Sequence, residues 1–373
     1  MISIFRSHFL KHRSFYSALA VSALTLTIAI SATSAAIPSK KFSSPTETFI
    51  TKHMRNKNGT FSTYLKSAAS TDANLAAGRE ALSESLGLWM QYAVVKKNQL
   101  DFNQGYDLLT KYFMTSQSYI AWKLQPEGST SVQTNALGDD LRIVDHLLKG
   151  YDKWPQERYL STAQAITGTL QAAARQNGYF VDFHDFQNNQ SSSTLSLVYV
   201  DISALQAMRD HQLIDSVTYE QHVNVLLNMP KGEVFFPKTF DVNNKNYSYE
   251  DQVSLIDQLI VGIHLAELGE EPKELISFLK KELKVQKKLA GRYDRVTGKA
   301  SVSYESPSVY GLATLLALEC GDQEWAQQLN KKMLAFRGKD TAYPGGYVFD
   351  KNTHIFDNLF PLVAEVSLYS YEK

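Results

Sequence analysis

Cysteine is nearly absent from this 373-residue chain, which contains only Cys320. A single thiol forms no internal disulfide and supplies no thiolate metal cluster. Cys320 ends the apolar helical stretch YGLATLLALEC, so we interpret it as a small buried hydrophobic residue rather than a nucleophile.

An excess of charge is also missing, because 38 basic residues balance 38 acidic ones. This balance indicates neither a nucleic-acid-binding surface nor a basic membrane-binding face. Glycine and proline are few, at 19 and 10 residues, while 44% of the residues are hydrophobic. The chain therefore has the composition of an ordered protein with one large core.

Several catalytic motifs are absent from the sequence. It contains no Gly-x-Ser-x-Gly elbow, no phosphate-binding glycine loop and no His-Glu-x-x-His zinc motif. His184 and Asp185 form a close histidine–carboxylate pair, and two ligands make a poor metal site. We therefore expect neither a metal nor a cofactor.

The N-terminus has the order of an export signal. Arg6, Lys11 and Arg13 precede the apolar run SALAVSALTLTIAI, and the small residues SATSAA follow. This predicts a signal peptide at 1–36, or an uncleaved anchor because the run is slightly long. No cysteine follows it, so a lipid anchor is not expected. We expect secretion, or a location on the extracellular face of the envelope.

The rest of the chain is predicted to be helical and to form a single domain at 49–373, after a linker at 37–48. Short runs such as EVFFPKTF and GGYVFD indicate hairpins or loops between helices. Eleven or twelve helices with alternating short and long connections predict an all-α fold, an (α/α)6 barrel. Apolar residues recur at helical spacing in 81–97, 102–116, 137–151, 158–177, 196–210, 216–229, 251–268, 272–289, 307–320, 323–336 and 356–371.

Acidic residues open three of these helices. They are Glu84 in SESLGLW, Asp139 and Asp140 in NALGDDLRI, and Glu250 and Asp251 in NYSYEDQVSL. Each alone is explained by the helix dipole, which favours negative charge at a helix N-terminus. Three such sites with aromatic residues nearby also suit glycosidic-bond cleavage, which requires two carboxyl groups in opposite protonation states.

Aromatic side chains near these sites are candidates for stacking on sugar rings. They are Trp89, Trp122, Trp154, Tyr199, Tyr247 and Tyr249, and Trp122 and Tyr249 are the strongest candidates. The competing interpretation is that they belong to the core, as most aromatic residues of helical proteins do.

These segments resemble glycoside hydrolase family 8. SESLGLWMQYAV is similar to the helix start that carries the family's general acid, and IAWKL to its apolar-Ala-Trp-Arg segment. NALGDDLRIVDHLLKGYDKW resembles the Ala-(Ser/Thr)-Asp-(Ala/Gly)-Asp-x-x-Ile signature, with Gly138 at the place of the first aspartate. SYEDQVSLIDQL resembles the helix that carries the general base. The order of these segments matches that of the family across nearly the whole mature chain. The match is to a divergent branch, similar to hydrolases of exopolysaccharide loci.

The resemblance implies an inverting endo-glycosidase that cleaves a β-linked polysaccharide. Glu84 would be the general acid, and Asp251 or Glu250 the base that activates water. Asp139 or Asp140 would hydrogen-bond the distorted sugar. The two catalytic carboxyl groups should then lie roughly 6.5–9.5 Å apart.

Further residues complete the predicted site. Glu305, next to Tyr304 in SYESPSV, is a substrate contact or a rival base, although a turn-capping role explains it equally well. Arg142 is a candidate substrate ligand and the only basic residue within the three acidic motifs. Asp257 is interpreted as a buried polar contact two turns into its helix.

Two other functions stay open at this point. A barrel that binds glycan without turnover would explain the altered second motif. A polysaccharide lyase would need basic residues beside its base to neutralise a uronate, and the motifs are mostly acidic. We expect a monomer whose partner is a polysaccharide and not a nucleic acid.

Overall fold

A computed structural model describes residues 42–68 and 75–373. The predicted signal peptide at 1–36 lies outside the described residues. Residues 42–373 form one compact unit. Part of the predicted linker is wrong, because the first helix, α1, already begins at Pro45. The Ser44 side chain caps it by accepting a hydrogen bond from the Thr46 backbone N–H, and Pro45 occupies its first turn.

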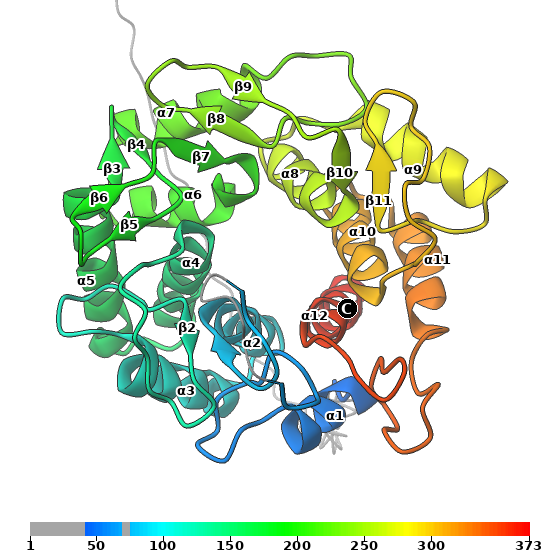
Figure 1. Ribbon diagram of the computed structural model, residues 1–373, viewed down its shortest axis with the longest axis horizontal. Helices are drawn as coiled ribbons and strands as arrows, with labels where there is room; N and C mark the ends of the chain where they lie inside the picture. Colours follow the sequence, from blue (N-terminus) through cyan, green and yellow to red (C-terminus); the bar gives the residue numbers. More distant parts are fainter. Residues whose placement is uncertain (1–41, 69–74) are drawn as a thin grey trace, which may run out of the picture. The chain divides into compact units, whose positions relative to one another are not determined.

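Twelve α-helices in the described part of the chain form two concentric rings (Figure 1). The inner ring closes because each inner helix packs on the next and the last packs on the first. The inner helices are α2 (Ser83–Val95), α4 (Leu137–Lys153), α6 (Ile202–Asp210), α8 (Leu255–Glu267), α10 (Pro307–Glu319) and α12 (Phe356–Tyr371). The outer helices are α1 (Pro45–His53), α3 (Gln99–Leu108), α5 (Glu157–Ala173), α7 (Ser216–Leu227), α9 (Lys273–Val285) and α11 (Gln323–Leu334). The predicted (α/α)6 barrel is confirmed.

The two rings differ in how their helices are buried. In α10, an inner helix, nearly every residue from Pro307 to Leu318 is buried, whereas the outer helix α9 buries only Leu275, Ile276 and Leu279. Gly311 lets α10 approach α12 closely, since a Cβ there would lie 3.0 Å from the backbone of Phe360. The inner helix α10 is therefore apolar on all sides, whereas the outer helix α9 is amphipathic.

Short elements connect the helices. A π-helical turn follows α3 at η1 (Leu109–Phe113), and a 3₁₀ turn precedes α6 at η2 (Leu197–Tyr199). Small antiparallel sheets pair β1 with β2, β3 with β4, β5 with β6 and β10 with β11, and β7-β8-β9 form a three-stranded sheet. The strands are β1 (Ala81–Leu82), β2 (Lys123–Leu124), β3 (Arg175–Gln176), β4 (Tyr179–Phe180), β5 (His184–Asp185), β6 (Gln190–Ser191), β7 (Thr194–Ser196), β8 (Thr239–Asp241), β9 (Tyr247–Ser248), β10 (Gln252–Ser254) and β11 (Arg292–Asp294).

The first turns of neighbouring inner helices meet at one end of the barrel. The Ser83 hydroxyl at the start of α2 donates to Asp139 in the first turn of α4. The Ser308 hydroxyl of α10 likewise donates to Asp357 of α12, at 2.8 Å. Acidic side chains from different helices are thus gathered at the N-terminal ends of the inner ring. Across residues 42–68 and 75–373, no helix combines the length and apolarity that crossing a membrane requires.

Candidate active site

Glu84 is the second residue of α2 and is positioned by the strand pair before it. Leu82 of β1 pairs with Lys123 of β2, and the Ser83 N–H donates to the carbonyl of Trp122 at 3.0 Å. The Glu84 side chain remains 28% exposed, so its carboxyl group is reachable. Trp122 lies next to this helix start with a partly exposed side chain, as a sugar-stacking residue would require.

The Glu84 carboxyl has the electrostatics of a proton donor. Burial, followed by the charge of Asp139, raises its pKa from an ordinary 4.5 to about 7. The Arg142 guanidinium, 3.6 Å from Glu84 Oε1, opposes this rise, and the charge of Asp257 adds to it. Desolvation therefore outweighs both the arginine and the helix dipole. A carboxyl with this pKa holds its proton up to near-neutral pH.

Asp139 and Asp140 lie side by side in α4 in different surroundings. Asp139 accepts hydrogen bonds from the Ser83 hydroxyl and the Glu84 backbone N–H, yet burial still raises its pKa to about 6. Asp140 is 1% exposed and accepts from the Asn135 amide at 2.6 Å, and burial raises its pKa well above the usual range. The prediction that Asp140 contacts the sugar is therefore wrong, because the surrounding side chains cover it. Asp139 acts directly on Glu84.

Gly138 gives the Tyr199 ring access to the acid pair of Glu84 and Asp139. A Cβ on Gly138 would lie 2.2 Å from the Tyr199 ring, so only glycine admits the ring there. Burial raises the pKa of the Tyr199 hydroxyl, and the charges of Asp139 and Glu84 raise it further. The tyrosine that the sequence suggested as a sugar platform therefore lies beside the acids.

Asp257, which the sequence interpretation had assigned to a buried contact, is the second acid, after Asp139, whose charge raises the pKa of Glu84. Residues Gln252–Ser254 form β10 against β11, so α8 begins only at Leu255 and Asp257 lies in its first turn. The helix had been predicted to begin at 251, which placed Asp257 two turns inside. Its charge acts on Glu84, and Lys238 bonds its Oδ2 atom. The sequence did carry a signal for this helix start, because Asp257 comes three residues after Ser254, the spacing typical of a capping serine and an acid in the first turn.

The predicted bases lie before α8. The Asp251 side chain is exposed, and its carbonyl accepts from the Arg295 N–H at 2.9 Å. Glu250 Oε1 lies 3.7 Å from Lys238 Nζ, the same ammonium that holds Asp257. In the described residues, no hydrogen bond or ion pair joins Asp251 or Glu250 to Glu84. Glu250 therefore borders the site, and Asp251 points to solvent.

The predicted aromatic contacts divide into exposed and buried ones. Trp89 is 1% exposed and packs on Phe61, with ring centroids 5.0 Å apart. The prediction that Trp89 binds substrate is therefore wrong, because a ring inside the core offers no face to a sugar. Tyr249 is partly exposed and lies under the Arg295 guanidinium at 4.7 Å.

Tyr304 and Glu305 lie before α10. The Tyr304 ring is 54% exposed and lies over Gly291, where a Cβ would meet the ring at 2.2 Å. Glu305 accepts a hydrogen bond from the Tyr310 hydroxyl. Within the described ranges, neither residue contacts Glu84, so Tyr304 and Glu305 stay peripheral substrate-contact candidates.

One cluster in the described chain has the residue types of a metal site. Asp201, His264 and Glu267 offer ligand atoms within 4.8 Å of one another, beside a cavity of about 110 Å³ inside the inner ring. His264 Nδ1 lies 3.1 Å from Glu267 Oε2, and its Nε2 lies 3.3 Å from the Val198 carbonyl oxygen, so both ring nitrogens have hydrogen-bond partners within the protein. The Lys149 ammonium, 2.6 Å from Ser203 Oγ, also places its charge near Asp201. The cluster is best explained as an internal ion-pair network.

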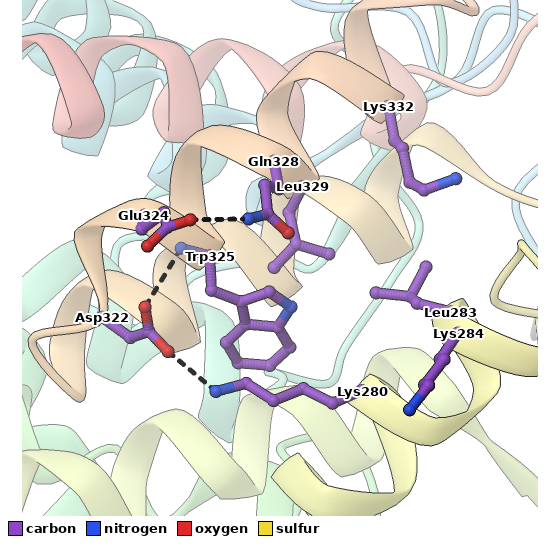
Figure 2. A pocket seen from close by; sticks show the side chains of 9 residues that line it. All are labelled: Lys280, Leu283, Lys284, Asp322, Glu324, Trp325, Gln328, Leu329 and Lys332. Atoms are coloured by element: carbon purple, nitrogen blue, oxygen red, sulfur yellow. Dashed lines mark hydrogen bonds and ion pairs between the residues drawn. The ribbon is translucent and has the colours of Figure 1, made fainter.

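A second hollow, of about 420 Å³, lies on the outer wall between α9 and α11 (Figure 2). Its acids are paired conventionally: Asp322 accepts from Lys280 Nζ at 2.8 Å and caps α11. The Trp325 ring lies beneath this lysine at 4.8 Å. The Lys280 bond lowers the pKa of Asp322, so this carboxyl is not a candidate proton donor.

Comparison with known proteins identifies relatives over most of the chain. No family model matches it. The Bacillus subtilis (strain 168) protein YdaJ, which carries a provisional lipoprotein description, is 37% identical over 329 residues, covering 87% of each chain.

Two solved structures extend the comparison. An α-amylase from Clostridium perfringens superposes with a TM-score of 0.77 at 26% identity, covering 87% of this chain and 96% of that one. Endoglucanase Cel10 of Klebsiella pneumoniae, a family 8 glycosyl hydrolase, gives a TM-score of 0.61 at 15% identity, covering 87% and 98%. The Cel10 likeness establishes the fold alone.

Proposed function

Because this chain belongs to a divergent, glycan-acting family that includes YdaJ and has the fold of glycoside hydrolase family 8, we propose that it hydrolyses a polysaccharide by inversion. One observation carries the proposal: Glu84 is partly exposed, and its pKa is raised to about 7, in part by the charge of Asp257, an acid on another inner helix. Separated carboxyl groups in opposite protonation states are what single-displacement hydrolysis requires.

Each acid has a defined step in this mechanism. Protonated Glu84 donates its proton to the leaving glycosidic oxygen as the bond to the anomeric carbon breaks. Asp257, whose carboxylate Lys238 binds, takes a proton from the water whose oxygen attacks that carbon from the opposite face. Asp139 supports the donor, since its charge raises the pKa of Glu84. Asp257 thus replaces Asp251 and Glu250 as the proposed base.

The surroundings of the acids suit a sugar chain. Trp122 and Tyr249 are partly exposed and Tyr304 is exposed, and all three lie near the starts of inner helices. Aromatic rings stack on the apolar faces of sugars, and their polar edges hydrogen-bond. We propose an endo-acting enzyme on a β-linked exopolysaccharide, located at the cell envelope or outside it.

A second candidate substrate is an α-linked glucan. The α-amylase matches this chain at 26% identity and a TM-score of 0.77, against 15% and 0.61 for the endoglucanase. The same acid and base serve either linkage, because they act on the glycosidic oxygen and the anomeric carbon from opposite faces.

The test uses the full chain with amylose, a soluble β-1,4-glucan and an acetylated β-linked amino-sugar exopolysaccharide. Chromatography sizes the products, and proton NMR follows the anomer released first. We expect oligosaccharides of inverted configuration from one polymer, and about 10²–10⁴-fold slower release from the Glu84→Gln variant. Retained configuration contradicts the mechanism. Binding without turnover indicates a glycan-binding protein, and unsaturated products absorbing in the ultraviolet indicate a lyase.

A further inference from the structure

We propose that Lys238 is a positioning residue that fixes the carboxylate of Asp257 for catalysis. This inference rests on the proposed function and adds a residue to it. Lys238 comes directly before β8, and none of the three acidic motifs contains it. Its ammonium binds one oxygen of Asp257 and leaves the other for the attacking water.

The contacts around the ammonium define this role. Lys238 Nζ bonds Asp257 Oδ2 and lies 3.7 Å from Glu250 Oε1. The positive charge also acts on Asp182, whose carboxylate is already occupied by the N–H and hydroxyl of Ser196. Within residues 42–68 and 75–373, Oδ1 of Asp257 accepts no hydrogen bond. One lysine therefore orients an acid that keeps one oxygen available.

Backbone contacts hold the two partners in register. The Lys238 N–H donates to the Ser248 carbonyl at 2.7 Å, and its carbonyl accepts from the Leu197 N–H at 3.0 Å. Phe236 lies two residues before Lys238, and Gln258 directly follows Asp257. The Phe236 N–H donates to Gln258 Oε1 at 2.6 Å, and Gln258 Nε2 donates to the Phe236 carbonyl at 3.2 Å. The start of α8 and the segment before β8 are thus tied together independently of the ion pair.

This arrangement matters because a base must be aligned with its water. A carboxylate held at one oxygen by a charge-assisted hydrogen bond loses its freedom to rotate. Misplacement of a catalytic group by about 1 Å costs roughly 10²-fold in rate. The pair is also shielded, with side chains 34% and 22% exposed, so solvent screens it incompletely.

The decisive experiment compares Lys238→Met, Lys238→Arg and a matched control, Lys280→Met. Lys280 forms the corresponding lysine–aspartate pair on the outer wall, with Asp322, where the side chains are 47% and 36% exposed. Each full-length variant is assayed for kcat, KM and Tm on the polymer that the wild type cleaves.

We expect Lys238→Met to lower kcat by about 10–100-fold with KM changed less than about threefold. Lys238→Arg should restore most of the loss, because it supplies a donor to the same oxygen. Lys280→Met should leave kcat unchanged.

Three results overturn the assignment. They are full kcat in a folded Lys238→Met protein, a rise in KM alone, which would make Lys238 a substrate ligand, and loss of kcat that arginine does not restore. Wild-type turnover and its loss in Glu84→Gln are scored in the same assay. Without wild-type turnover the proposed function fails, and the assignment fails with it. If the wild type turns over substrate, the kcat values of the Lys238 variants alone decide whether Lys238 is a positioning residue.

Discussion

The N-terminal end of the inner ring and the hollow on the outer wall both contain acidic residues at helix starts, but the pKa values of these acids shift in opposite directions. In the hollow, Asp322 is paired with Lys280 and caps α11 (Figure 2). The bond with Lys280 lowers the pKa of Asp322. At the inner end, burial raises the pKa of Glu84 and Asp139 despite a nearby arginine and helix N-termini. An acid at a helix start is structural when its charge is satisfied and becomes a candidate proton donor when it is desolvated.

The largest effect is expected from removing the proton donor. Glu84→Gln keeps the shape of the side chain and abolishes proton transfer, so kcat should fall by about 10²–10⁴-fold. Steady-state kinetics compares the kcat of Glu84→Gln with that of Glu324→Gln, since Glu324 is an acid that lines the hollow on the outer wall. An equal loss in both variants, or none in Glu84→Gln, removes the distinction between the two regions.

A comparable loss is expected at the base. Asp257→Asn should lower kcat by about 10²–10⁴-fold, whereas Asp251→Asn should change it little, because that side chain points to solvent. Kinetics of the two variants decide between the positions. The opposite ranking would return the base to the residue that the sequence resemblance favoured.

A smaller effect concerns pH. The alkaline limb of kcat/KM should report the Glu84 titration near pH 7. Arg142 lowers the pKa of Glu84, so Arg142→Met should move this limb to higher pH. Full pH profiles of wild type and variant measure the displacement. A limb that stays in place, or moves to lower pH, means that Arg142 does not act on the proton donor.

Much of the fold could be predicted from the sequence, because helical periodicity is a local property. The sequence interpretation did not predict helix α1. Its start signals are Ser44, Pro45 and Glu47, but the polar residues around them resembled a linker. Burial is a tertiary property, so the helix pattern alone could not separate Trp89 in the core from Trp122 beside the site. Asp257 was misjudged because a three-residue strand pairing, distant in sequence, moved the start of α8.

The smallest predicted effect is on stability. The folded-state pKa of Glu84 lies above its ordinary value of 4.5, so folding favours the protonated form. The stability that this contributes is complete below pH 4.5 and is lost as the pH rises through about 7. Glu84→Gln should therefore raise Tm at pH 8 and change it little at pH 4.5. Thermal unfolding at both pH values measures this, and an equal shift at the two would indicate a packing effect instead.

The most direct test of the account is the titration of the Glu84 carboxyl itself. Carbon NMR of the protein labelled at glutamate side chains, compared with Glu84→Gln, identifies that signal. We expect a midpoint near pH 7, falling in Asp257→Asn because the charge that raises it is gone. A midpoint near 4.5 in the wild type would show that Glu84 is ionised at neutral pH and is not the proton donor.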